Sequence, residues 1–100
     1  MEKDLLNIIN NYGVLNQLKH FQSEVYELTE AIFDYEYTDK YGIEELYTHL
    51  KEHIEEEIAD NLNFINQFIE YYELNRDNIE ITMNKKIKRQ LGRMEDENKN

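Results

Sequence analysis

No proline occurs among the 100 residues of the chain, and glycine occurs only three times. These two residues interrupt helices most strongly, because proline removes a backbone donor and glycine loses the most conformational freedom on folding. Glutamate, leucine, isoleucine and lysine are abundant instead, and they favour helices. The sequence therefore predicts an all-α protein, a small bundle of about four helices.

Apolar residues recur at spacings of three and four along most of the chain, which is the pattern of one helix face. Turn-forming residues interrupt the pattern near Gly13, over residues 36–42 and near Asn75, where a new helix N-cap is expected. The third periodic segment could be one helix or two. The helices expected on this basis cover residues 4–9, 14–35, 43–72 and 79–91.

A chain of this length forms a single domain, which we expect to span residues 1–94, with a disordered tail at residues 95–100. The apolar fraction of 40% supports only a thin core, so self-association, at least as a dimer, is expected to cover the remaining apolar stripes. The formal charge of -11 repels phosphate polymers, and nucleic acid is not an expected partner.

The sequence also predicts where the protein is found. No apolar run approaches the roughly 18 residues that span a bilayer, and the first four residues lack the basic and then apolar layout of a secretion signal. Cysteine is absent, so neither disulfides nor thiolate metal sites can form. We expect a soluble cytoplasmic protein that does not contact a membrane.

Two acidic pairs of equal spacing, Glu24/Glu27 and Glu57/Asp60, lie on the second and third expected helices. At 100° per residue, Glu57 falls where a core residue should lie, with Asn61 on the same arc, while Glu24 borders the apolar stripe of its own helix. Carboxylates in such positions repel one another and lose hydration unless a cation compensates. The pairs therefore indicate a four-carboxylate site for Mg²⁺ or Mn²⁺, which prefer several oxygen ligands.

The spacing of these pairs is not specific, because other glutamates share it. Residues three apart on a helix hold their Cβ atoms roughly 5–6 Å apart whether or not a metal is bound. Solvated or helix-paired acids therefore remain an alternative to a metal site. The further pairs with this spacing are Glu27/Glu30, Glu52/Glu55 and Glu70/Glu73.

The residues around the two pairs add a family resemblance. The first pair stands in the run NQLKxxxxExxELxxAI over residues 16–32, and the second in EEIADxLxF over residues 56–64. In this order, the runs resemble the MazG-like all-α nucleotide pyrophosphohydrolases, whose signature is ExxE followed by ExxD. The resemblance covers about residues 14–94, and the 29 residues between Glu27 and Glu57 lie at the long edge of the family's range.

This resemblance implies Mg²⁺-dependent hydrolysis of an NTP or dNTP to the monophosphate and pyrophosphate, a nucleotide-pool house-cleaning activity. It implies a MazG-like fold that assembles as a dimer or tetramer. The catalytic residues are expected to be Glu27 and Glu57, and Glu27, nearer the rim, is the candidate for taking the proton from the attacking water. The metal ligands implied by the resemblance are Glu24, Glu27, Glu57 and Asp60.

Substrate-binding residues are expected from both ends of the domain. Lys86-x-x-x-Gln90-x-x-Arg93 is similar to the family's Lys, Asn, Arg run, with glutamine where asparagine is usual. Lys86 and Arg93 lie two turns apart on one helix face and would meet the triphosphate. The polar residues expected to line the nucleotide pocket are Asn16, Gln17, His20 and Asn61.

Two alternative functions stay open. A phosphoribosyl-ATP pyrophosphohydrolase of histidine synthesis shares the fold, and a non-catalytic helical adaptor protein with degenerate acids is a different class, although retention of all four acids argues against lost activity. His49-x-x-Glu52-His53 also matches a zinc peptidase pattern. The chain is too short for such an enzyme, and His53 is instead expected to pair with Glu57 one turn on or to lie near bound phosphate.

Overall fold

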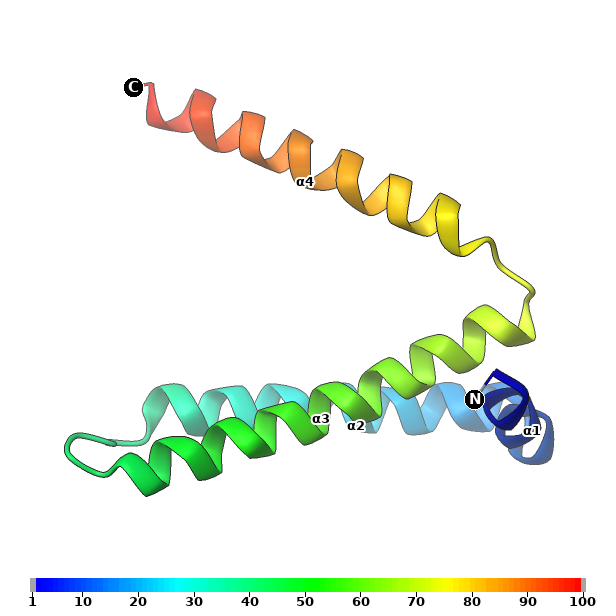
Figure 1. Ribbon diagram of the computed structural model, residues 1–100, viewed down its shortest axis with the longest axis horizontal. Helices are drawn as coiled ribbons and strands as arrows, with labels where there is room; N and C mark the ends of the chain where they lie inside the picture. The colour runs from blue at the N-terminus through cyan, green and yellow to red at the C-terminus, as the bar shows by residue number, and fades with distance from the viewer. Residues whose placement is uncertain (1, 100) are drawn as a thin grey trace.

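The computed structural model describes residues 2–99, and every regular element in them is an α-helix (Figure 1). The expected all-α class is confirmed for this part of the chain. The third periodic segment is a single helix rather than two. The four helices are α1 (Glu2–Tyr12), α2 (Val14–Tyr37), α3 (Glu44–Tyr71) and α4 (Arg76–Asn98).

The helices begin and end near the turn-forming residues of the sequence. Gly13 separates α1 from α2 with a φ of 91°, a conformation that residues with a Cβ rarely adopt. Asn75 caps α4, because its side-chain oxygen accepts a 3.0 Å hydrogen bond from the backbone N–H of Asn78. The N-cap expected near Asn75 is therefore confirmed.

The C-terminal end of α4 differs from the expectation of a disordered tail. The helix continues through residues 95–98 and ends at Asn98. No glycine or proline follows Gly92, so the sequence contains no strong stop signal after that residue. Asn100, the last residue of the expected tail, lies outside the described residues.

The two long helices α2 and α3 form an antiparallel hairpin, and α1 packs against both at the end opposite the connecting loop (Figure 1). The loop is closed by Lys40, whose ammonium group donates hydrogen bonds to the backbone oxygens of Tyr35 and Thr38. The same ammonium group lies over the rings of Tyr35 and Tyr47, 4.3 and 5.5 Å from their centroids. The loop end of the hairpin is thereby held together by one buried cation.

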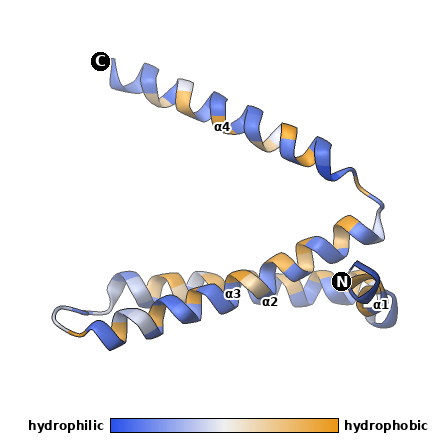
Figure 2. Ribbon diagram, viewed as in Figure 1, coloured by the Kyte–Doolittle hydropathy of each residue, from blue (hydrophilic) through white to orange (hydrophobic). Residues whose placement is uncertain are grey.

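The interior of this three-helix unit is unusually polar. Figure 2 shows apolar residues recurring along all four helices, yet most of the large ones stay exposed. Because buried polar groups cost free energy unless they are paired, such an interior needs a reason. The buried residues are the apolar Leu5, Ile9, Ala31 and Phe64 and the polar or charged Gln17, Lys40, Glu57, Asn61 and Gln67.

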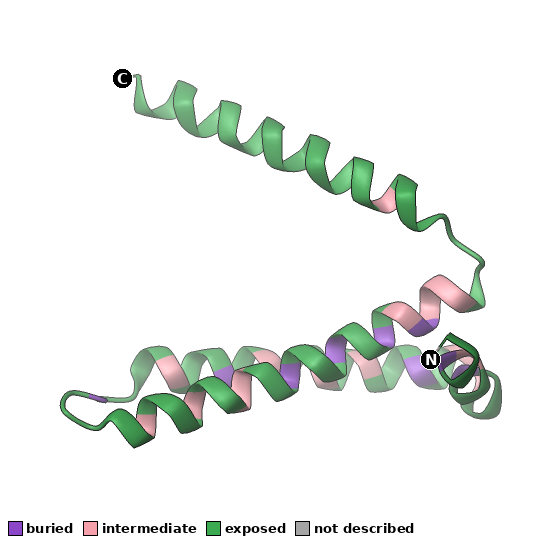
Figure 3. Cartoon of the chain, in the orientation of Figure 1, coloured by how far each residue is buried: buried purple, intermediate pink, exposed green. Residues whose placement is uncertain are grey.

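The fourth helix leaves the other three, so the expected four-helix bundle is three packed helices and one extended one (Figures 1 and 3). None of the residues of α4 is buried. The first turn of α4 is tied to α3 by Arg76, which donates hydrogen bonds to Asn66 and Glu70. The radius of gyration of 17.8 Å reflects this extension, since a compact chain of 100 residues has about 13 Å.

Across residues 2–99, no helix is both long enough and apolar enough to cross a bilayer. The longest, α3, carries eight acidic residues along its length, from Glu44 to Glu70.

Candidate metal centre and adjoining cleft

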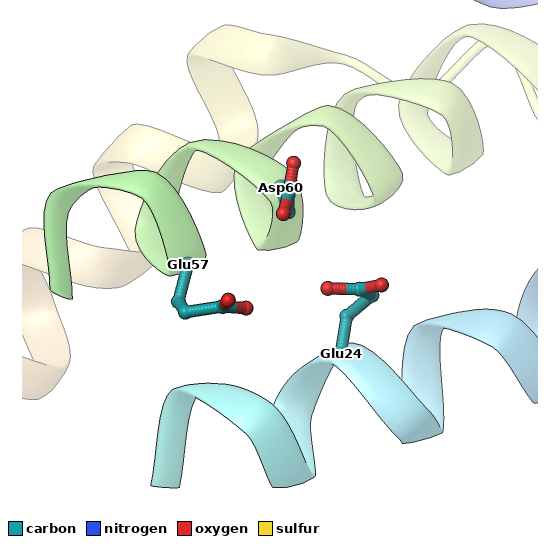
Figure 4. A group of neighbouring side chains, drawn as sticks. All are labelled: Glu24, Glu57 and Asp60. Atoms are coloured by element: carbon teal, nitrogen blue, oxygen red, sulfur yellow. The ribbon is translucent and has the colours of Figure 1, made fainter. Parts of the chain in front are cut away.

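Three acidic side chains from the two long helices meet in the middle of the hairpin. Glu24 comes from α2, and Glu57 and Asp60 come from α3 (Figure 4). One carboxylate oxygen of each lies within 4.8 Å of the corresponding oxygens of the other two. The facing arrangement expected from the helical positions is therefore present for these three residues.

The amide of Asn61 joins the two helices at this point. Its Nδ2 donates a 3.0 Å hydrogen bond to the backbone oxygen of Glu24 on α2 and a 2.7 Å bond to the backbone oxygen of Glu57 on α3. Asn61 is buried, as its helical position predicts. Its amide therefore holds the backbones that carry the acids, rather than facing a ligand.

Two of the carboxylates are only half paired. The Oε1 atoms of Glu24 and Glu57 lie 3.4 and 3.6 Å from the Nε2 atoms of His20 and His53, each one helical turn earlier. The Oε2 atoms of both glutamates are buried and have no hydrogen-bond partner. With side chains only 14% and 12% exposed, these oxygens carry a desolvation cost that nothing in the described chain offsets.

The electrostatic consequence is seen at Glu24, whose pKa is raised above its ordinary value of 4.5. Burial is the main cause, because it disfavours the charged form. The negative charges of Glu27, Asp60 and Glu57 raise the pKa further, and so does a side-chain hydrogen bond with Glu27. The cluster therefore favours the arrival of positive charge, either a proton or a cation.

Glu27 lies at the edge of this arrangement. It is exposed and does not belong to the group of three, yet its charge and its hydrogen bond both act on Glu24. The structure thus brings three of the four expected ligands together and places the fourth beside them, at the rim.

A cleft of about 510 Å³ runs from the cluster toward α1. Glu24 and Asp60 line one part of it, and the expected pocket residues Gln17 and His20 line it as well. Asn16 does not line the cleft. Its side chain donates a 2.8 Å hydrogen bond to the backbone oxygen of Tyr12, across the break between α1 and α2.

The remaining expected substrate residues, Lys86, Gln90 and Arg93, are exposed on α4. Because α4 extends away from the hairpin, a single chain does not bring them to the acidic cluster (Figure 1). His49 and His53 line a separate hollow of about 220 Å³ and do not belong to the group of three acids. His53 pairs with Glu57, as expected.

Several cleft residues were not expected from the sequence. Phe64 and Gln67 follow Asp60 by four and seven residues, so the face of α3 that carries the acids also carries them. This spacing was a usable signal. The side chains of α1 gave no comparable signal, because their place in the cleft depends on tertiary packing; they are Leu5, Ile8 and Tyr12.

The cluster and the cleft form one continuous site with carboxylates at one end. No family model, no curated protein and no solved structure matches the chain. The donor groups of the site indicate its chemistry. Several carboxylate oxygens, two of them buried and unpaired, suit a hard divalent cation such as Mg²⁺ or Mn²⁺, and a cleft of this size suits a small organic ligand.

We expect Glu57→Gln to raise the melting temperature of the metal-free protein, because it removes one buried negative charge from the cluster. The same change should weaken binding of Mg²⁺ and Mn²⁺ by about tenfold or more, which corresponds to at least about 1.4 kcal/mol. Thermal melts and calorimetric titration with each ion measure both effects. Glu55→Gln, at an exposed position of α3, is the control and should change neither. Unfolding of Glu57→Gln would indicate a structural role instead.

We also expect the metal-free protein to lose stability as pH rises above 4.5. Because the pKa of Glu24 is higher in the folded chain, folding favours its protonated form. That contribution is fully present below pH 4.5 and is lost as pH rises through the folded-state pKa. Urea unfolding at a series of pH values should show this fall for the native chain, with a smaller fall for Glu24→Gln. Identical pH profiles would contradict this assignment.

Proposed function

We propose that the protein is a Mg²⁺-dependent nucleotide pyrophosphohydrolase that converts an NTP or dNTP to the monophosphate and pyrophosphate. The observation that carries this proposal is the pair of buried, unpartnered oxygens of Glu24 and Glu57. They lie in one cluster with Asp60, and Glu24 and Asp60 line the end of a cleft. The resemblance of ExxE and ExxD to the MazG-like family supplies the reaction. Nucleotide-pool house-cleaning is the corresponding role.

Glu24, Glu57 and Asp60 would hold the Mg²⁺, with Glu27 at the rim as the fourth acid. Mn²⁺ is chemically similar and would bind the same oxygens. A divalent ion in this position would offset the charge of the phosphate oxygens and lower the pKa of a bound water. Such an ion would offset the desolvation and the mutual repulsion of the carboxylates that raise the pKa of Glu24. It would also give the unpaired Oε2 atoms of Glu24 and Glu57 a partner.

The other side chains of the site would have separate roles in the reaction. Glu27 is exposed beside the cluster, where its carboxylate is open to solvent as well as hydrogen-bonded to Glu24, and it would accept the proton of the attacking water. Glu57 is buried and fixed by its position next to Asn61, which suits a ligand rather than a mobile base. Phosphoryl transfer depends chiefly on positioning and on charge stabilisation, and the cleft that adjoins the acids would position the nucleotide.

We further propose that the active form is a homo-oligomer, a dimer or a tetramer. Most exposed apolar residues of α4 lie on one face, namely Met83, Ile87, Leu91 and Met94. Residues 81–94 carry five basic residues and no acidic one. The rest of the chain is strongly acidic, so a second copy offers α4 both an apolar and an oppositely charged partner surface. In that arrangement Lys86, Gln90 and Arg93 of one copy can approach the phosphates bound by another.

The activity test measures pyrophosphate and phosphate separately after incubation with a panel of NTPs and dNTPs and Mg²⁺. We expect pyrophosphate from at least one nucleotide, and a loss of kcat of about 100-fold or more in Glu27→Gln, because general bases contribute about 10²–10⁴-fold. Glu30→Gln, three residues further along α2 and exposed, is the matched control and should keep full activity. Release of phosphate alone would exclude this reaction, and no release from any nucleotide would favour the adaptor alternative.

The oligomer is tested with two isoleucines of α4 that differ only in the face they occupy. Ile87 lies within the apolar stripe with Met83 and Leu91, whereas Ile81 points to the opposite side of the helix. We expect light scattering to show a dimer or tetramer for the native chain and for Ile81→Asp, and a smaller species with reduced activity for Ile87→Asp. A monomeric native chain with full activity would refute this part of the proposal.

A further inference from the structure

Two glutamines face each other inside the cleft, at the end where α1 covers it. Gln17 of α2 donates a 2.8 Å hydrogen bond from Nε2 to Oε1 of Gln67 on α3. The two residues are only 5% and 4% exposed, and both line the cleft. A pair of apolar side chains would fill this space without the cost of desolvating two amides.

The amide pair keeps unused hydrogen-bonding capacity. Each primary amide has two donor hydrogens and an acceptor oxygen, and one shared bond uses little of this. Among the described residues, the buried side-chain oxygens and nitrogens without a partner are those of Glu24 and Glu57. Gln17 Oε1 and Gln67 Nε2 are therefore accessible from the cleft. They offer an acceptor and a donor side by side to a ligand bound there.

The distance between this pair and the carboxylates is set by helix geometry. Gln17 precedes Glu24 by seven residues, and Gln67 follows Asp60 by seven on the antiparallel partner helix. At a rise of 1.5 Å per residue, seven residues span about 10 Å on each helix. The cleft is thus a slot with acids at one end and amides about two helical turns away. A nucleotide places its base edge and its phosphates at opposite ends of a similar length.

We propose that Gln17 and Gln67 bind the hydrogen-bonding edge of the substrate's nucleobase. The base then lies at the α1 end of the cleft, and the phosphates lie at the acidic cluster. This inference rests on the proposed function, since it assigns the base-binding part of the same site. It specifies the substrate class as nucleotides, in contrast to inorganic polyphosphates or sugar phosphates.

The amide pair is suited to more than one base. Every common base presents a donor and an acceptor next to each other on its pairing edge. If both glutamine amides rotate by half a turn together, their mutual hydrogen bond is kept and the donor and acceptor offered to the base exchange places. The pair therefore accepts bases with an exocyclic amine as well as those with a carbonyl group. Tyr12, 60% exposed at the cleft, supplies a ring on which either kind can stack.

The experiment uses uridine, cytidine and ribose 5-phosphate as probes of the full chain without added metal. Nuclear magnetic resonance follows the side-chain amide signals of Gln17 and Gln67 during each titration. We expect both nucleosides to shift these signals and ribose 5-phosphate to leave them unchanged. Gln17→Leu and Gln67→Leu should each weaken nucleoside binding about tenfold. The control, Gln22→Leu, is a glutamine of α2 outside the cleft and should bind as the native chain does.

Nucleosides that leave both amide signals unshifted up to their solubility limit would overturn the inference. Equal nucleoside affinity in the leucine variants and the native chain would overturn it as well. If a leucine variant fails to fold, the native amide signals still decide the question. Failure of the proposed hydrolysis has a different signature, because nucleosides would then bind at the amides while no nucleotide releases pyrophosphate.

Discussion

The side-chain amide of Asn61 ties the two long helices together at the point where their acids meet. It donates to the backbone oxygen of Glu57 within α3 and to that of Glu24 on α2, and the second bond fixes the register of α2 against α3. A shift of one helix along the other would break the bond to Glu24 and leave one donor hydrogen of this buried amide unpaired, which is costly. The positions of the carboxylates and of the two glutamine amides two turns away follow from that register.

This arrangement leaves a core that contains few apolar side chains and therefore gains little stability from hydrophobic burial. Glu57, Gln17 and Gln67 occupy interior positions that leucine or isoleucine would fill in a chain selected for stability alone. Polar groups retained against such a cost are typical of functional sites. Stability has to come from elsewhere, and two sources stand out: the buried Lys40 at the hairpin loop and the apolar surface that remains available for association.

Much of the hairpin was predictable because apolar residues recur at spacings of three and four along each long helix. The burial of Glu57 and Asn61 followed from a rotation of 100° per residue, and the cap at Asn75 followed from its side chain. The placement of α4 could not be predicted in the same way, because a stripe of apolar residues identifies the face of a helix that can be buried but not the surface that covers it. The spacing of Gln67 from Asp60 placed it on the acidic face of α3, but its hydrogen bond with Gln17 did not follow from the sequence, because the two residues lie fifty positions apart. No local pattern reports such a pair.

The basic stretch at residues 81–94 gives the chain an electrical polarity. In an isolated copy, the cations of α4 lie apart from the acidic hairpin, and the molecule is a large electric dipole that salt would screen over about 10 Å at 0.1 M. A polyanion repelled by the hairpin would still be attracted to α4. Packing of α4 against an acidic neighbour cancels this dipole, so assembly would also remove the surface through which an isolated copy adheres to polyanions indiscriminately.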